Sequence, residues 1–322
     1  MTAVAIYGAT GYGGQELLRY LAQHPSVVVA AVFSERNAGR PVAEVLPALE
    51  GFYRELAFSD PAEPPPPECA GAFLATPHGA SRDLARRIAA ARPDVKIVDL
   101  SMDFRLEEEG FVYGLTETNR GRIREARWVA NPGCFATGAL LALAPLYERD
   151  LVDGDVVLAQ TTGSSGSGAQ EKPGTHHPER AQDQRAYRVL DHQHLGEIEA
   201  ELRRFGCRGC AISMVPQSGP FSRGIFTVAH FRADPGADVA ALYRERYARE
   251  PFVRLRNESP ALRHVARTNF CDVSVHADRG RVVVLTAIDN LGKGMAGEAI
   301  QNMNLLLGLE ETAGLLVPGA NP

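Results

Sequence analysis

Residues 4–14 read VAIYGATGYGG, a short apolar strand pattern that runs directly into a glycine-rich turn. Leucines then recur at helical spacing over residues 15–22. Residues 27–33 (VVVAAVF) are continuously apolar, which is typical of a strand buried on both faces of a sheet. A strand, a glycine turn, a helix and a second strand in this order form a βαβ unit. The start of the chain therefore predicts a parallel sheet of the dinucleotide-binding type.

The alternation of strands and helices continues beyond this unit. Three further apolar strand patterns follow, at residues 72–75, 95–100 and 128–130. Residues 81–91 carry an apolar helical face between the first two of them. This order predicts a Rossmann-type α/β domain with helices on both faces of the sheet, formed by residues 1–134 and 293–322. Four consecutive prolines at 64–67 indicate a stiff surface connector, and a proline-motif docking site is the alternative interpretation.

The second half of the chain is rich in strands and poor in helices. Strand-like segments lie at residues 155–161, 211–216, 224–231, 271–277 and 281–288. One helix is expected over residues 238–248, and a last helix over 294–307 is expected to pack on the first domain. Runs of strands with few helices predict an α+β substrate domain, residues 135–292, built on a mostly antiparallel sheet.

Composition excludes several classes of function. The 322 residues include 34 Lys and Arg against 39 Asp and Glu, so the formal net charge is −5. A mildly acidic chain without basic clusters is not expected to bind nucleic acid or a membrane surface. No apolar run has the ~18 residues that a spanning helix needs, and the start of the chain shows no leader. The five scattered cysteines, including the Cys207 and Cys210 pair without a redox context, favour free thiols in the cytoplasm.

The glycine-rich turn is the expected cofactor site. Gly8, Gly11 and Gly14 allow a tight turn and a close approach of the backbone to a pyrophosphate at the start of the following helix. A glycine-rich turn without a ligand is the alternative. The end of the second strand reads Ser34, Glu35, Arg36, which mixes the signals for NAD and NADP. We favour NADP, with Ser34 and Arg36 as ligands of its 2′-phosphate.

Cys134 is the candidate nucleophile. Residues 131–138 read NPGCFATG, so a Pro-Gly turn places this cysteine in the first turn of an apolar helix. There the helix dipole and free N–H groups stabilise a thiolate, which can attack an activated acyl group. A buried cysteine that serves only as a small apolar side chain is the competing interpretation.

Histidines and arginines later in the chain offer partners for this thiol. His192 and His194 precede a short helical stretch, and a neutral imidazole there could accept the thiol proton. The adjacent His176 and His177 lack the spaced ligands of a metal site, so no metal is expected. Arg180 or Arg185 could hold a phosphate or a carboxylate, and the small-residue loop at 163–168 is expected to bind an anion.

Seven segments together carry a resemblance to a known family. They are residues 8–14 (GATGYGG), 74–79 (LATPHG), 99–105 (DLSMDFR), 131–134 (NPGC), 163–168 (GSSGSG), 192–198 (HQHLGEI) and 287–294 (AIDNLGKG). In this order, and over nearly the whole chain, they make the sequence similar to the N-acetyl-γ-glutamyl-phosphate reductase family. That family lies within the semialdehyde dehydrogenase superfamily and acts in arginine biosynthesis.

The resemblance implies a role for individual residues. Cys134 would be the nucleophile and His194 the acid/base residue. The implied cofactor contacts, with the two 2′-phosphate ligands included, are Gly8, Thr10, Gly11, Tyr12, Gly13, Ser34, Arg36, Pro77 and Asn290. The implied substrate contacts are Ser164, Ser165, Gly166, Arg180 and His192. The resemblance also implies a homo-oligomer, a dimer or tetramer, that associates through the sheet of the substrate domain.

The implied reaction is the NADPH-dependent reduction of N-acetyl-γ-glutamyl phosphate to the 5-semialdehyde and phosphate through a thioester on Cys134. Three alternatives stay open. The first is the related reductase of a carrier-protein-bound aminoadipyl phosphate in lysine biosynthesis, which the HPER at 177–180 resembles. The second is aspartate-semialdehyde dehydrogenase, and the third is an NADP-sensing binding protein without catalytic activity.

Overall fold

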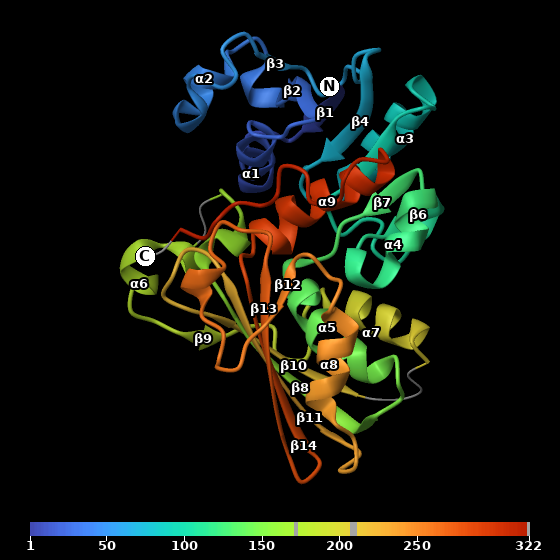
Figure 1. Ribbon diagram of the computed structural model, residues 1–322. Coiled ribbons are helices and arrows are strands. Elements are labelled where there is room, and N and C mark those ends of the chain that lie inside the picture. The colour runs from blue at the N-terminus through green and yellow to red at the C-terminus, as the bar shows by residue number, and fades with distance from the viewer. Residues whose placement is uncertain (171–172, 207–210, 321–322) are drawn as a thin grey trace. The chain divides into compact units, whose positions relative to one another are not determined.

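The computed structural model describes residues 1–170, 173–206 and 211–320, and it divides into two compact units (Figure 1). The first unit contains Met1–Gly133 and Met295–Val317. The second unit contains Cys134–Gly294 and Pro318–Pro322. The chain therefore passes from one unit to the other directly before Cys134 and directly after Gly294.

The first unit is built on a seven-stranded sheet in which all neighbouring strands are parallel, in the order β3-β2-β1-β4-β5-β7-β6. Its strands are β1 (Thr2–Tyr7), β2 (Val27–Phe33), β3 (Phe58–Ser59), β4 (Cys69–Leu74), β5 (Lys96–Asp99), β6 (Phe111–Tyr113) and β7 (Trp128–Ala130). Its helices are α1 (Tyr12–Leu21), α2 (Val42–Val45), α3 (Ser81–Ala91), α4 (Thr116–Glu125) and α9 (Gly297–Leu306). The predicted parallel α/β sheet is confirmed.

The strand order reverses at β1, because β2 lies on one side of it and β4 on the other. In open parallel sheets, ligands bind at the carboxyl ends of the strands where the order reverses. The glycine-rich turn follows β1 at this position. Apolar residues of α3 pack on one face of the sheet, with Leu84 and Ile88 in the same buried cluster as Phe33. α9 contacts β5, α1 and α4.

The second unit contains a mixed, mostly antiparallel sheet in the order β12-β13-β14-β11-β8-β10-β9. Its strands are β8 (Val152–Thr162), β9 (Arg185–Ala186), β10 (Ile212–Ser218), β11 (Ile225–Ala233), β12 (Val253–Leu255), β13 (Cys271–Asp278) and β14 (Arg281–Ile288). Its helices are α5 (Cys134–Tyr147), α6 (His177–Arg180), α7 (Leu195–Arg204) and α8 (Val239–Tyr247). Among the described strands of this second sheet, only the β8–β10 and β12–β13 pairs are parallel. The predicted α+β architecture is confirmed.

One face of this second sheet is covered by helices. α5 packs on β8, β11 and β14, while α7 contacts β10 and α8 contacts β13. Beyond Cys134 every residue of α5 is buried, which explains its uniformly apolar sequence. The last helix begins later than predicted: residues Gly292–Ala296 form a π-helical turn, and α9 follows from Gly297. Short 3-10 turns lie at Glu35–Asn37, Pro47–Leu49, Glu108–Gly110, Ser164–Ser167, Pro173–Thr175 and Leu262–His264.

Candidate active site

The glycine-rich turn between β1 and α1 has the conformation that its residues predict. Gly8 has φ +75°, and a Cβ there would lie 2.4 Å from the Ala75 carbonyl oxygen. A Cβ on Gly14 would lie 2.5 Å from the Ala9 Cα, so neither position accepts a larger residue. α1 begins after Gly11, and no side chain caps its N-terminus. Its first N–H groups can therefore bind an anion.

The other predicted cofactor contacts of the first unit lie near this turn. The Ser34 Oγ, at the end of β2, is buried 3.4 Å from the Thr10 Oγ1 and accepts a hydrogen bond from Asn37. Arg36 is exposed on the turn that follows, and among the described residues it forms no ion pair. Pro77 is exposed after β4. Because β1, β2 and β4 are parallel neighbours, these segments follow the same edge of the sheet.

Cys134 is the first residue of α5, as predicted, and its side chain is partly exposed. The position at a helix N-terminus stabilises a thiolate. Gly294 packs directly against it, because a Cβ on Gly294 would lie 2.9 Å from the Cys134 Cβ and 3.3 Å from its Cα. Sequence reasoning did not single out Gly294 for this contact.

The two predicted histidines lie together beside the start of α5. The rings of His192 and His194 meet edge to face at 4.7 Å, and both contact the ring of Phe135, at 5.1 and 5.9 Å. Both side chains are buried. The Nδ1 of His192 accepts a hydrogen bond from the His194 backbone N–H. Burial is the main cause that lowers the pKa of His192 to about 4, with Arg188 contributing.

The His194 ring faces a carboxylate. Its Nε2 lies 4.0 Å from the Glu197 Oε1, and Glu197 is almost fully buried one turn along α7. A carboxylate beside an imidazole orients the ring. Glu197 could not be selected from the sequence, because it is one of several acidic residues on an amphipathic helix.

Tyr187 is a further residue that sequence reasoning missed. It is partly buried, its ring lies 5.9 Å from that of His192, and burial raises the pKa of its phenol. The charges of Cys134 and Arg180 act on the same phenol in opposite directions. Tyr187 is therefore within electrostatic range of the candidate nucleophile and of a predicted substrate arginine.

The small-residue loop at 163–168 is held by main-chain hydrogen bonds. The N–H groups of Ser164 and Ser165 donate to the carbonyls of Phe221 and Ser222, and the Ser165 hydroxyl also donates to Ser222. Gly166 donates to Gly163. These N–H groups are engaged within the protein, so the loop differs from the open anion cradle that its composition suggests.

Asn290 fixes this loop from the other side. Its Nδ2 donates to the Ser165 Oγ at 3.0 Å, and its Oδ1 accepts from the Gly224 N–H at 2.7 Å. The side chain is buried. The structure therefore places Asn290 beside a predicted substrate residue in the second unit.

Asp289 organises the turn that carries Gly294. Its fully buried carboxylate accepts two hydrogen bonds from Arg223, at 2.9 and 3.0 Å, and others from the N–H groups of Leu291 and Gly292. Its carbonyl accepts from the Gly294 N–H at 2.9 Å. One residue thus determines the conformation of the chain that packs against Cys134.

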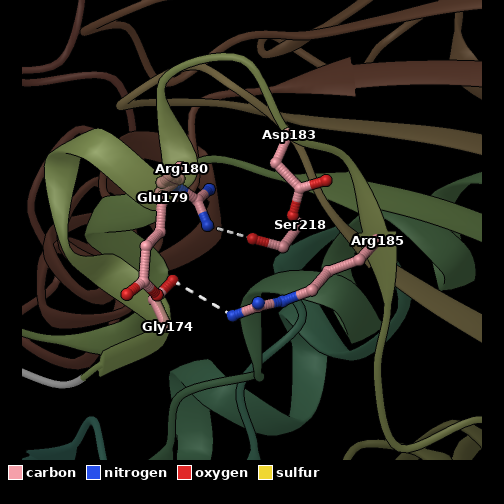
Figure 2. Close-up of a pocket in the computed structure, with 6 residues that line it drawn as sticks. All are labelled: Gly174, Glu179, Arg180, Asp183, Arg185 and Ser218. Atoms are coloured by element: carbon pink, nitrogen blue, oxygen red, sulfur yellow. Dashed lines mark hydrogen bonds between the residues drawn. The ribbon is translucent and has the colours of Figure 1, made fainter.

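Arg180 lies at the end of α6, and its side chain connects neighbouring segments of the second unit. Its guanidinium donates to the Thr162 and Gly219 carbonyls and to the Ser218 hydroxyl. It lines a pocket together with Arg185 (Figure 2).

Cys207 and Cys210 lie outside the described residues. Within the described part of the chain there is no cluster of potential metal ligands and no helix long and apolar enough to cross a membrane.

Comparisons with known proteins identify the two parts of the chain and its fold. Residues 3–126 match the NAD binding domain of semialdehyde dehydrogenases, and residues 134–290 match their dimerisation domain. Aspartate semialdehyde dehydrogenase II from Vibrio cholerae, complexed with ASA, has a TM-score of 0.76 at 19% identity and covers 96% of this chain and 98% of its own. Aspartate semialdehyde dehydrogenase with NADP from Candida albicans has a TM-score of 0.77 at 15% identity, covering 95% and 99%. The fold is that of a semialdehyde dehydrogenase.

Relatives with higher sequence identity indicate which family of semialdehyde dehydrogenases the chain belongs to. N-acetyl-γ-glutamyl-phosphate reductase from Methanopyrus kandleri is 44% identical over 100% of both chains. The enzyme of the same name from Pseudomonas syringae is 41% identical, also over 100% of both. The chain belongs to the N-acetyl-γ-glutamyl-phosphate reductase family.

Proposed function

We propose that this protein reduces N-acetyl-γ-glutamyl phosphate to N-acetyl-glutamate 5-semialdehyde with NADPH and releases phosphate. The observation that carries the proposal is Cys134 at the start of α5, with the rings of His192 and His194 packed on the adjacent Phe135. The full-length relatives named for this reaction support it.

Cys134 is the nucleophile of this reaction. Its thiolate attacks the acyl carbon, the bond from that carbon to the phosphate oxygen breaks, and a thioester forms. N–H groups in the first turn of α5 stabilise the oxyanion. After reduction of the thioester, the hemithioacetal collapses, the carbon–sulfur bond breaks, and His194 transfers the protons that this requires.

The first unit has the features that NADPH requires. The glycine turn leaves the start of α1 open for the pyrophosphate, and Ser34 with Arg36 follows β2 where a 2′-phosphate would lie. Gly8, Thr10, Gly11, Tyr12, Gly13 and Pro77 would contribute the remaining contacts of this unit. When bound, the cofactor supplies the hydride.

The reaction is tested in the oxidative direction, with N-acetyl-glutamate semialdehyde, phosphate and NADP⁺. Cys134→Ser should abolish phosphate-dependent NADPH formation while its NADPH affinity, measured by fluorescence titration, stays unchanged. Cys69→Ala, a substitution of another free cysteine, should retain activity. Appreciable turnover by Cys134→Ser would refute the thioester mechanism.

The same assay separates the proposed function from its alternatives. Aspartate semialdehyde and a carrier-bound aminoadipate semialdehyde are offered beside the N-acetyl substrate. A preference for either one would replace the proposed substrate while keeping the chemistry. NADPH binding without turnover of any of the three would indicate a binding protein.

We also propose that the protein is a homo-oligomer that associates through the second sheet. The helices cover one face of this sheet, and Val228 on the other face is paired with Leu285 on β14 and Ala159 on β8. Val157 on the same face is 41% exposed. A dimer formed there would be disrupted by Val228→Asp, and light scattering after size exclusion would detect the change in mass.

A further inference from the structure

The main chain of Asn131 is fixed in place just before the nucleophile. Its N–H donates to the Asp99 carbonyl, at the end of β5, at 2.7 Å. Its own carbonyl accepts from the Nε of the buried Arg105 at 3.0 Å. Between Asn131 and the start of α5 lie only Pro132, whose ring fixes its φ, and Gly133, and both are buried. The bonds of Asn131 therefore leave the start of α5 little freedom to move.

The side chain of Asn131 is fixed as well. Its Nδ2 donates to the Met295 carbonyl at 3.0 Å, and its Oδ1 accepts from the Asn302 Nδ2 at 3.1 Å. Asn131 is 1% exposed, and Asn302 is fully buried. Because an unpaired amide at this depth is unfavourable, the two bonds hold the side chain in one orientation.

The residue before Met295 packs on the nucleophile. A Cβ on Gly294 would lie 2.9 Å from the Cys134 Cβ and 3.3 Å from its Cα, so the two backbones are close. Asn131 and Cys134 lie on one segment of the chain, and the Gly294–Met295 peptide lies on the other. The two segments are therefore joined at two points, by the amide–carbonyl hydrogen bond and by this packing contact. The hydrogen bond determines how closely the second segment approaches Cys134.

Asn302 supports Asn131 but has a different set of partners. Its Nδ2 also donates to the Gly114 carbonyl, at 2.8 Å. A Cβ on Gly114 would lie 2.6 Å from this nitrogen, so the approach requires glycine. Removing the Asn302 side chain would break two buried hydrogen bonds and keep the bond from Asn131 to Met295. Removing the Asn131 side chain would also break two, and one of them is the bond to Met295.

We propose that Asn131 is a positioning residue of the reaction. Its amide bond to the Met295 carbonyl holds Cys134 and the segment packed on it at the spacing that attack on the acyl carbon requires. Asn131 acts through Cys134 and not on the substrate. The inference rests on the proposed function, in which Cys134 is the nucleophile. Since a displacement of ~1 Å at a reacting atom costs about 100-fold in rate, the loss of this bond should be visible in kcat.

The test compares Asn131→Ala with Asn302→Ala in the oxidative assay. Both variants lose two buried hydrogen bonds, so the Tm should fall to a similar extent in both. Only Asn131→Ala loses the bond to Met295, so its kcat should fall about 10- to 100-fold, against less than about threefold for Asn302→Ala. The KM values for N-acetyl-glutamate semialdehyde, phosphate and NADP⁺ should stay within about threefold of the wild type in both variants.

Asn131→Asp tests the same bond in a side chain of unchanged shape, also if the alanine variant does not fold. Its carboxyl can still accept from Asn302, but it can donate to the Met295 carbonyl only while it carries a proton. The kcat of this variant, relative to that of the wild type at the same pH, should therefore fall as the pH is raised. A purely structural role would give no such pH dependence.

The rate at which iodoacetamide alkylates Cys134 shows whether the thiol itself has changed. In Asn131→Ala this rate should differ from the wild type by less than about twofold, because Cys134 remains the first residue of α5. A loss of alkylation parallel to the loss of kcat would mean that Asn131 acts on the thiolate and not on its position, which would overturn the proposal.

Other results would overturn it as well. They are a wild-type kcat for Asn131→Ala, an equal fall for Asn302→Ala, and a relative kcat of Asn131→Asp that does not change with pH. If the wild type does not turn over N-acetyl-glutamate semialdehyde with phosphate, the proposed function itself fails, which is a different result from any of these.

Discussion

Replacing Gly294 with alanine tests whether the position of Cys134 is set by its contact with the 289–294 turn. The new Cβ would lie 2.9 Å from the Cys134 Cβ, 3.2 Å from the Asp289 carbonyl oxygen and 3.3 Å from the Cys134 Cα. Since non-bonded carbons are comfortable at ~3.5–4 Å, one of the two segments must move by about half an ångström or more. Displacing a reacting atom by ~1 Å costs about 100-fold in rate, so we expect kcat to fall about 10-fold or more.

The stability change should be small by comparison. Overpacking costs ~1–3 kcal/mol, and replacing a helical glycine by alanine returns up to ~1 kcal/mol. Calorimetry should therefore show a Tm lowered by only a few degrees. Gly121→Ala on α4, where a Cβ meets nothing within 4 Å, is the control and should leave kcat unchanged. A Gly294→Ala variant with wild-type kcat would refute the reasoning.

Three further outcomes are expected. Asp289→Ala leaves Arg223 partly buried without its carboxylate and should lower the free energy of unfolding by ~3–5 kcal/mol in urea titrations, unlike Asp94→Ala at the surface. The pKa of His192 is about 4 in the folded protein against an ordinary value of 6.5, so the unfolded chain binds a proton first as the pH falls. The free energy of unfolding should therefore decrease by up to about 3 kcal/mol between pH 6.5 and pH 4. A His192→Phe variant whose unfolding has the same pH dependence as the wild type would contradict this. Arg36→Ala should weaken NADPH binding at least tenfold without affecting NADH, and an equal loss for both would exclude Arg36 as a 2′-phosphate ligand.

The backbone architecture could be predicted because its signals are local. The apolar run at Val27–Phe33 and the helical pattern at Ser81–Ala91 reappear with the predicted bounds. The same holds for the placement of Cys134, since a Pro-Gly turn before an apolar run determines where α5 begins. In each case a few neighbouring residues decide the structure.

The contacts inside the site could not be predicted in this way. Tyr187 lies within electrostatic range of Cys134 although it is more than fifty residues further along the chain. Gly294 packs against Cys134 although it is more than one hundred and fifty residues further along. Arg180 was expected to hold substrate, and its guanidinium also anchors the ends of β8 and β10. The sequence shows that an arginine is present at this position. Only the folded structure shows which backbone carbonyls accept its hydrogen bonds.

The geometry around the two histidines argues for a division of roles. His192 already accepts a backbone hydrogen bond at Nδ1, and burial holds its pKa near 4, so at neutral pH it is an uncharged ring that does not retain a proton. His194 instead has the buried Glu197 carboxylate 4.0 Å from its Nε2, which can orient the ring. A residue that must take the proton of Cys134 and later return it needs a ring held in a fixed orientation. We therefore infer that His194 is the acid/base residue, and that His192 positions it by packing between Phe135 and Tyr187.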